Sequence, residues 1–232
     1  MDFGRKVVQF YTKLVPPTNL PRGVSVMNPY LTSSARGYLE SFSDKFYLGS
    51  NKRVLVLGIN PGRFGAGITG VTFTDPVALS RFCDVPNDLP QVRELSSVFV
   101  YDFIAAWGGP RRFYSDFFLT AVSPLGYVKA GKNYNYYDDP ALLAATTPFV
   151  VDSIKRMVTL GCRTDVAILL GQGKNQKVIS ELNKTHYFFK TILALEHPRF
   201  IMQYRRKHIP QYLDKYHQVF TQALDFRHKP LN

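Results

Sequence analysis

Four short apolar runs constrain the fold of this chain more than any other feature of its sequence. Each run is nearly continuous rather than alternating, which is typical of strands in a parallel sheet that is covered on both faces. The runs span residues 53–58 (RVLVLG), 117–122 (FFLTAV), 165–171 (DVAILLG) and 191–197 (TILALEH). We therefore predict four buried, mostly parallel strands.

Helical patterns separate these runs. Asp75 before Pro76 and Asp139 before Pro140 each place an N-cap residue in front of a proline at the first helical position. Further segments with helical patterns cover residues 1–14, 149–158, 173–184 and 209–224. Strands that alternate with helices predict an α/β fold: a three-layer α/β/α domain with a central, mostly parallel four-stranded sheet. With 232 residues, of which 45% are hydrophobic, the chain fits one such domain over residues 1–232.

The charge of the chain indicates an anionic partner. It carries 29 Lys and Arg against 17 Asp and Glu, a net charge of +12. Nucleic acid is the first candidate for a soluble domain of this charge, and the 14% of aromatic residues supplies rings that could stack on bases.

The cysteines and the hydropathy pattern indicate a location. Cys83 and Cys162 are too few for a disulfide framework, which favours a reducing, cytoplasmic compartment. No run approaches the roughly 20 apolar residues of a membrane helix, and residues 1–14 lack the apolar centre of a signal peptide. We expect a cytoplasmic monomer that does not contact a membrane.

Unusual residues follow the predicted strands. Asn60-Pro61-Gly62 follows the first run, and His197-Pro198 ends the fourth. Because ligands of parallel sheets bind outside the carboxyl ends of the strands, we expect Asn60 and His197 to face a common pocket.

A glycine-rich segment raises the alternative of a nucleotide cofactor. Gly65, Gly67 and Gly70 match the pattern G-x-G-x-x-G. In a dinucleotide fingerprint the first glycine comes directly after the strand, whereas Gly65 lies seven residues beyond Gly58 and the next helix start is Asp75. No Gly-Lys-Ser/Thr motif occurs, and no His and Cys residues have the spacing of a metal site. We therefore predict no cofactor and no metal, with a nucleotide-dependent enzyme as an alternative.

The segment 58–73 (GINPGRFGAGITGVTF) resembles the first motif of the single-strand-selective monofunctional uracil-DNA glycosylases, a family of the uracil-DNA glycosylase superfamily. Segments 26–30 (VMNPY) and 123–127 (SPLGY) and the pair His197-Pro198 resemble further family segments in the same order, so the resemblance covers roughly residues 26–216. The matching positions of the first motif are Gly58, Asn60, Pro61, Gly62, Phe64, Gly65, Thr69, Gly70, Val71 and Phe73.

The resemblance implies roles for these residues. Asn60 is expected to orient the attacking water, His197 to donate to the departing base, and Phe73 to stack on a base flipped out of the DNA. Gly62 and Gly65 are expected to let the backbone approach the base. The full set of expected base-binding residues is Ile59, Gly62, Phe64, Gly65, Ala66, Phe73, Ser123 and Asn133.

Two departures from the family set this chain apart. The family places a uracil-reading asparagine two residues before its Cys-Pro-Leu segment, where this chain has Ala121; Asn133 or Asn135 are candidates to replace it. After His197-Pro198 the chain continues RFIMQYRRK, a divergent second motif that is similar to a bacterial branch of the family.

The basic segment after His197 predicts a DNA contact. Its cations are expected to bind phosphates, with an ordinary solvated surface as the alternative. Phe200, Ile201 and Met202 are either a wedge that fills the gap left by the flipped base or part of the core. The predicted DNA-binding residues are Arg63, Arg199, Phe200, Ile201, Met202, Tyr204, Arg205, Arg206 and Lys207.

Together these observations predict a DNA repair enzyme. It is expected to be a monofunctional glycosylase that releases uracil, 5-hydroxymethyluracil or deaminated purines from single- and double-stranded DNA by base flipping. A non-catalytic DNA-binding protein of the same fold is the second alternative, beside the nucleotide-dependent enzyme.

Overall fold

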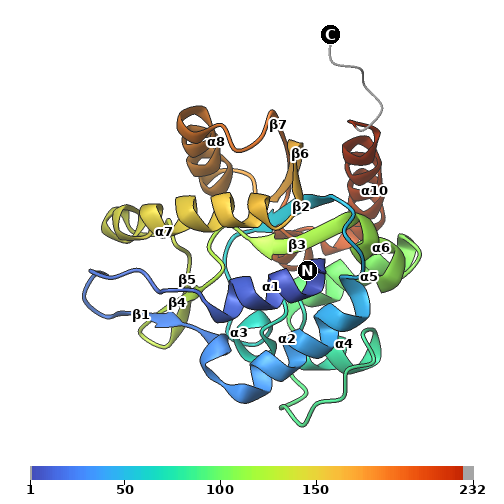
Figure 1. The fold of residues 1–232 in the computed structure, drawn as a ribbon, viewed down its shortest axis with the longest axis horizontal. Coiled ribbons are helices and arrows are strands. Elements are labelled where there is room, and N and C mark those ends of the chain that lie inside the picture. Colours follow the sequence, from blue (N-terminus) through green and yellow to red (C-terminus); the bar gives the residue numbers. More distant parts are fainter. Residues whose placement is uncertain (1, 227–232) are drawn as a thin grey trace.

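The structure is a computed structural model that describes residues 2–226, and its centre is a four-stranded parallel sheet (Figure 1). The strands are β2 (Arg53–Gly58), β3 (Phe117–Ala121), β6 (Cys162–Leu170) and β7 (Thr191–Leu195). Their order is β3-β2-β6-β7, and every neighbouring pair is parallel. The fold class and the four central strands predicted from the sequence are confirmed.

Helices cover both faces of this sheet. Phe117 and Phe118 are consecutive on β3, so their side chains point to opposite faces. Phe118 contacts Phe3 of α1, whereas Phe117 contacts Phe220 of α10. Helices α1 (Phe3–Thr12) and α10 (Ile209–Asp225) therefore lie in different layers, and the sheet is the middle layer of an α/β/α sandwich.

The predicted helices form where their caps indicated. Asp75 Oδ1 accepts the N–H of Ala78 at 2.7 Å and begins α4 (Pro76–Arg81). Asp139 likewise caps α7 (Pro140–Thr159), which joins the two predicted helical segments into one helix. The segment 173–184 forms α8 (Lys174–His186).

Four of the strand ends differ from the sequence prediction, two of them by one residue: β3 ends at Ala121 rather than 122, and β6 ends at Leu170 rather than 171. Strand β6 begins at Cys162 rather than 165, because Cys162 pairs with Arg53 across a bulge. Strand β7 ends at Leu195 rather than 197, because His197 is the N-cap of the next helix.

A second, antiparallel sheet was not predicted. It has the order β1-β4-β5 and consists of β1 (Val24–Met27), β4 (Gly126–Lys129) and β5 (Lys132–Tyr134). Ala130 and Gly131 join β4 to β5 with φ of 48° and 70°, the left-handed pair of a type I′ hairpin. This hairpin lies beside the carboxyl end of β2, where it contacts Asn60.

The remaining elements connect the layers. They are α2 (Ser33–Phe46), α3 (Ala66–Thr69), α5 (Leu95–Ala106), α6 (Pro110–Asp116), α9 (Pro198–Tyr204) and the 3₁₀ turns η1 (Pro29–Leu31) and η2 (Arg206–His208). Of these, α5 and α9 pack against each other and matter most for the site, since each begins with a polar side chain that faces a pocket.

Candidate active site

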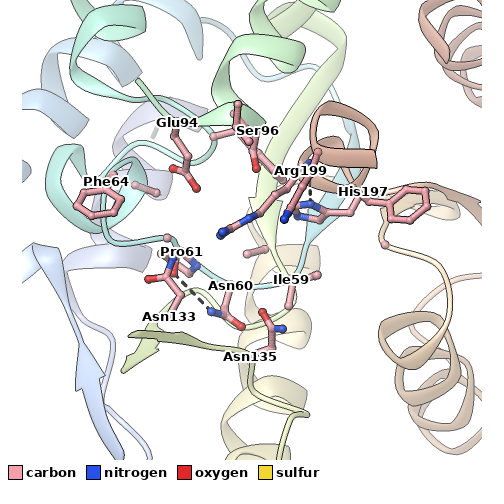
Figure 2. Close-up of a pocket in the computed structure, with 18 of the residues that line it drawn as sticks. Ile59, Asn60, Pro61, Phe64, Glu94, Ser96, Asn133, Asn135, His197 and Arg199 are labelled. Carbon is pink, nitrogen blue, oxygen red and sulfur yellow. Dashed lines mark hydrogen bonds between the residues drawn. The ribbon is translucent and has the colours of Figure 1, made fainter. Parts of the chain in front are cut away.

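A pocket of about 890 Å³ opens at the carboxyl ends of the central strands (Figure 2). Its walls come from the loop after β2, the start of α5, the β5 hairpin, and the start of α9. Asn60 and His197 both line it, as the sequence predicted. The other predicted residues that line it are Ile59, Gly62, Arg63, Phe64, Ala66, Phe73, Asn133, Arg199, Phe200 and Tyr204.

Two hydrogen bonds, to β5 and to the residues just after it, hold the carboxamide of Asn60 in one orientation. Its Oδ1 accepts the N–H of Tyr136 at 3.1 Å, and its Nδ2 donates to the carbonyl of Tyr134 at 3.3 Å. An amide oxygen has two lone pairs, so Oδ1 retains one for a water molecule in the pocket.

The imidazole of His197 is held by the first turn of α9. Its Nδ1 accepts the N–H of Arg199 at 3.1 Å. Burial, with a smaller contribution from the Arg199 charge, lowers the pKa of His197 to about 4. At neutral pH the ring is therefore uncharged and carries its proton on Nε2, where it can donate one hydrogen bond.

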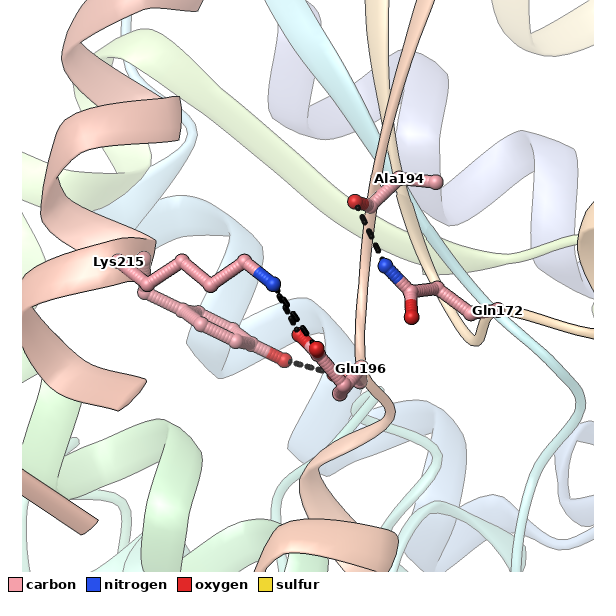
Figure 3. A network of polar contacts seen from close by, with 5 residues as sticks. Gln172, Ala194, Glu196 and Lys215 are labelled. Carbon is pink, nitrogen blue, oxygen red and sulfur yellow. Dashed lines mark hydrogen bonds and ion pairs between the residues drawn. The ribbon is translucent and has the colours of Figure 1, made fainter. Parts of the chain in front are cut away.

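Glu196, the residue before His197, is bound by α10 (Figure 3). The Glu196 carboxylate accepts from Nζ of Lys215 on α10 at 2.8 and 3.0 Å, and its carbonyl accepts from the hydroxyl of Tyr216. On the other side, Gln172 Nε2 donates to the carbonyl of Ala194 at 3.4 Å. The end of β7 is thus tied to α10 and to the loop after β6.

Phe73 forms a wall of the pocket beside His197. The two ring centroids lie 5.6 Å apart at 41°. Phe73 has a φ of 54°, a left-handed conformation that costs an aromatic residue free energy and tends to occur at functional sites. Its ring lies over Gly58, where a Cβ would be 2.6 Å from the ring.

Glu94, which the sequence analysis did not single out, also lines the pocket. It is half-buried at the start of α5, and its N–H donates to Asp75 Oδ2 at 2.8 Å. Its carboxylate lies against two glycines of the first motif: a Cβ on Gly62 would be 2.5 Å from Oε1, and one on Gly65 would overlap Oε2. Burial raises the pKa of Glu94 to about 7; Asp75 adds to the shift and Arg199 opposes it.

The glycines of the first motif therefore have a different neighbour from the one expected. Gly65 is not part of the pocket lining, and what lies close to Gly62 and Gly65 is the Glu94 carboxylate. The glycine-rich segment was the one sequence signal for Glu94. It indicated that some group lies close to this backbone, but not which group.

The G-x-G-x-x-G match is explained by packing. Gly65 faces Glu94, Gly67 faces the Met27 side chain, and Gly70 ends α3 with a φ of 72°. These contacts account for the glycines without a bound phosphate and remove the main support for the nucleotide alternative.

Three other predicted residues are buried away from the pocket, and Arg205, Arg206 and Lys207 lie outside its lining on the surface. Ser123 is fully buried, and its hydroxyl donates to the carbonyl of Leu125 at 2.9 Å and contacts the hydroxyl of Tyr127. Ile201 and Met202 are 0% and 6% exposed, because they lie on the face of α9 that packs against α5. The core interpretation is correct for these two, and the exposed wedge interpretation is wrong for them.

Cations and exposed aromatic rings surround the pocket; Arg63 is half-buried, whereas Arg205 is exposed. The Arg63 guanidinium lies 5.0 Å from the Phe64 ring centroid, and that of Arg205 lies 5.4 Å from the Phe200 ring, which is 40% exposed. Tyr204 contacts Phe200 with 5.5 Å between centroids. Arg206 and Lys207 in η2 are exposed and form no ion pair within residues 2–226.

Within residues 2–226, no helix has the length and apolar character needed to cross a membrane. No group of three or more potential metal ligands comes together within residues 2–226.

The parallel sheet and the pocket at the carboxyl ends of its strands can be compared with known protein families and solved structures. Residues 46–221 match the model of the uracil DNA glycosylase superfamily, and the chain belongs to that superfamily. Among solved structures it is similar to wild-type SMUG2 of Pedobacter heparinus, with 42% sequence identity and a TM-score of 0.94 over 97% of this chain and 99% of that one. A search of curated proteins found no match. The family predicted from the first motif is confirmed.

Proposed function

We propose that this protein is a monofunctional, cofactor-free DNA glycosylase that hydrolyses the N-glycosidic bond of uracil and related bases. The observation that carries the proposal is the pairing of Asn60 and His197 in one pocket, each with a fixed orientation and a free polar atom. Membership of the uracil DNA glycosylase superfamily supports it.

The two side chains have complementary tasks in this reaction. As the glycosidic bond breaks, positive charge develops on the sugar and negative charge on the departing base. The free lone pair of Asn60 Oδ1 orients a water toward the sugar carbon. The neutral His197 donates from Nε2 to the base carbonyl oxygen, where charge grows, so the base leaves as an anion without taking the imidazole proton. The C–N bond breaks, the water oxygen bonds to the sugar carbon, and the proton that the water releases goes to solvent or to the departed base.

The remainder of the pocket holds the extruded base. Phe73 stacks on one face of it. Ala121 contributes only a methyl group to the lining, which leaves room for 5-substituted uracils and for deaminated purines. Asn133 uses its Oδ1 to accept the N–H of Arg63 at 3.1 Å, so its Nδ2 is the atom left for the base.

The surface around the pocket binds the strand. Arg63 with Phe64, and Arg205 with Phe200 and Tyr204, offer rings for the neighbouring bases and cations for phosphates. Phe200 is the exposed apolar side chain that fills the gap left by the flipped base. We expect binding of single-stranded DNA, and of duplex DNA from which the base is extruded.

The protein is further proposed to act as a cytoplasmic monomer. Cys83 and Cys162 are both free and buried, which is compatible with a reducing compartment.

The test uses end-labelled single-stranded DNA with one uracil or one 5-hydroxymethyluracil, without metal or cofactor, followed by hot alkali. Strand cleavage at the modified position only after alkali is the expected result, with cytosine at that position as the control. Cleavage before alkali would contradict the monofunctional assignment. Intact DNA for both pyrimidines and for deaminated purines, with DNA still bound, would establish the non-catalytic alternative.

A further inference from the structure

The reaction described above uses Asn60 and His197 but leaves a carboxyl group of the same pocket without a role. Glu94 is half-buried and lines the cavity, and no hydrogen bond or ion pair from within residues 2–226 reaches its carboxylate oxygens. An ionisable side chain held in that state costs the fold free energy, since burial penalises its charged form. Such a group in a pocket is a candidate for direct contact with the ligand.

The fold holds Glu94 in place from two sides. The buried Asp75 accepts from Ala78 with Oδ1 and from the Glu94 N–H with Oδ2, so one carboxylate ties the starts of α4 and α5 together. The loop after β2 leaves space for the side chain only because residues 62 and 65 are glycines. The carboxyl is thus positioned by backbone contacts that the proposed catalytic pair does not need.

Glu94 and Asn60 enter the pocket from opposite sides, Glu94 from the start of α5 and Asn60 from the end of β2 (Figure 2). Asn60 must lie near the sugar carbon that the water attacks. The glycosidic bond of a bound base then lies near Asn60, and the edge of the base farthest from the sugar points to the opposite wall.

We infer that the Glu94 carboxyl is a base-contacting group that binds the edge of the extruded base farthest from the sugar. This inference rests on the function proposed above. In uracil that edge carries the N3–H and O4, and in a deaminated purine the ring N–H and its neighbouring oxygen. The substrate class is therefore bases whose far edge is a lactam, which is the edge that deamination creates.

Because a lactam edge carries an N–H beside a carbonyl oxygen, the protein group that binds it must offer a hydrogen-bond acceptor beside a donor. A protonated carboxyl supplies both, as a carboxamide does, whereas Ala121 on the same lining supplies neither. A carboxylate would instead place negative charge beside a base that is itself becoming negative. The protonated form of Glu94 is the active one.

The charged groups around Glu94 determine the pH range in which its carboxyl is protonated. Asp75 at the start of α4 favours the proton and Arg199 on α9 opposes it, and with burial the balance gives a pKa of about 7. Arg63 lies on the same lining. His197, with a pKa of about 4, stays neutral across the range in which Glu94 titrates.

The test compares wild type with Glu94→Gln and Glu94→Ala, and with Glu40→Gln as a matched control on an exposed position of α2. Base release from uracil-containing single-stranded DNA is measured under single-turnover conditions between about pH 5 and pH 9. The wild-type rate is expected to fall by about tenfold per pH unit above about pH 7. Glu94→Gln keeps a donor and an acceptor without a titrating proton, so its rate should not fall there. Glu94→Ala should be slower than Glu94→Gln at every pH.

Each outcome separates this inference from the proposed function. Thermal unfolding of each variant confirms that it is folded. If wild type releases uracil with a profile that stays flat above pH 7, or if Glu94→Gln keeps the descending limb, the role of Glu94 is wrong and the glycosylase assignment stands. If wild type releases no base at all, the proposed function itself fails.

Discussion

At the scale of single residues, Asn60 and His197 have different roles in the pocket, and a hydrogen bond to the backbone fixes which atom of each side chain stays available. Asn60 gives one lone pair to Tyr136, and His197 gives Nδ1 to Arg199, so each keeps one defined polar atom for the reaction. A pKa of about 4 keeps His197 neutral at physiological pH. A neutral donor suits a leaving base that gains charge gradually, because it needs no change of protonation state during the reaction.

Removing either side chain is expected to slow base release without loss of DNA binding. Asn60→Ala and His197→Ala should each reduce the single-turnover rate by about 10²- to 10³-fold, the usual cost of losing one such interaction. DNA affinity, measured by fluorescence anisotropy, should change little because neither residue is charged at neutral pH. His186→Ala on α8 is the control and should behave as wild type. A wild-type rate in either pocket variant would contradict the assignment.

The raised pKa of Glu94 also predicts how stability depends on pH. The folded state holds this proton up to about pH 7, whereas an unfolded glutamate loses it near its ordinary value of about 4.3. The folded state thus binds more protons in that window, and its stability falls as pH rises through it, by at most about 4 kcal/mol. Glu94→Gln should therefore melt at a higher temperature than wild type at about pH 8 and at a similar temperature at about pH 4. A difference that does not depend on pH would contradict this account.

At the scale of the elements, one buried carboxylate connects the start of α4 to the start of α5. Asp75→Ala removes the cap of α4 and the acceptor for the Glu94 N–H, and should destabilise the protein by about 2 kcal/mol. Asp139→Ala removes a comparable cap from α7 and is the matched control. Calorimetry should show a lower melting temperature for both variants. Only Asp75→Ala should also slow base release, because it removes the hydrogen bond that positions Glu94. Equal activity of the two would show that the connection does not matter for the site.

The elements also show which parts of the molecule could be predicted. Strand β2 was predicted with its bounds, since its apolar run is short and ends at Gly58 shortly before the turn residues Asn60-Pro61-Gly62, and the motif after it placed Asn60. Helix α5 was missed because Phe99, Val100 and Tyr101 are all buried in succession, which leaves no amphipathic pattern to detect. The β5 hairpin was missed because its strands are short and polar. Its hydrogen bond with Asn60 was therefore missed as well. Glu94 lies on an element without a sequence signature, and only the fold brings it to the glycines.

At the scale of the whole molecule, the net charge of +12 is useful only where cations are free to meet phosphates. Lys215 is engaged by Glu196 and Arg163 by Asp165, so these two charges stabilise the fold. Arg206 and Lys207 in η2, by contrast, are exposed next to the helix that begins with His197. The path of the DNA strand should therefore cross η2 on its way to the pocket.

This path predicts a change in the salt dependence of binding. Each phosphate contact contributes a slope of about −0.7 to the plot of log affinity against log salt for single strands. Arg206→Ala should weaken the binding of uracil-free single-stranded DNA and reduce the slope by about that amount. Lys177→Ala, on an exposed position of α8, removes the same charge from another surface and should leave the slope unchanged. Because the substitution touches neither Asn60 nor His197, the rate of base release at saturating enzyme should remain that of wild type. An unchanged slope for Arg206→Ala would mean that the segment after His197 is an ordinary solvated surface and that the strand approaches the pocket from the side of Arg63 and Phe64.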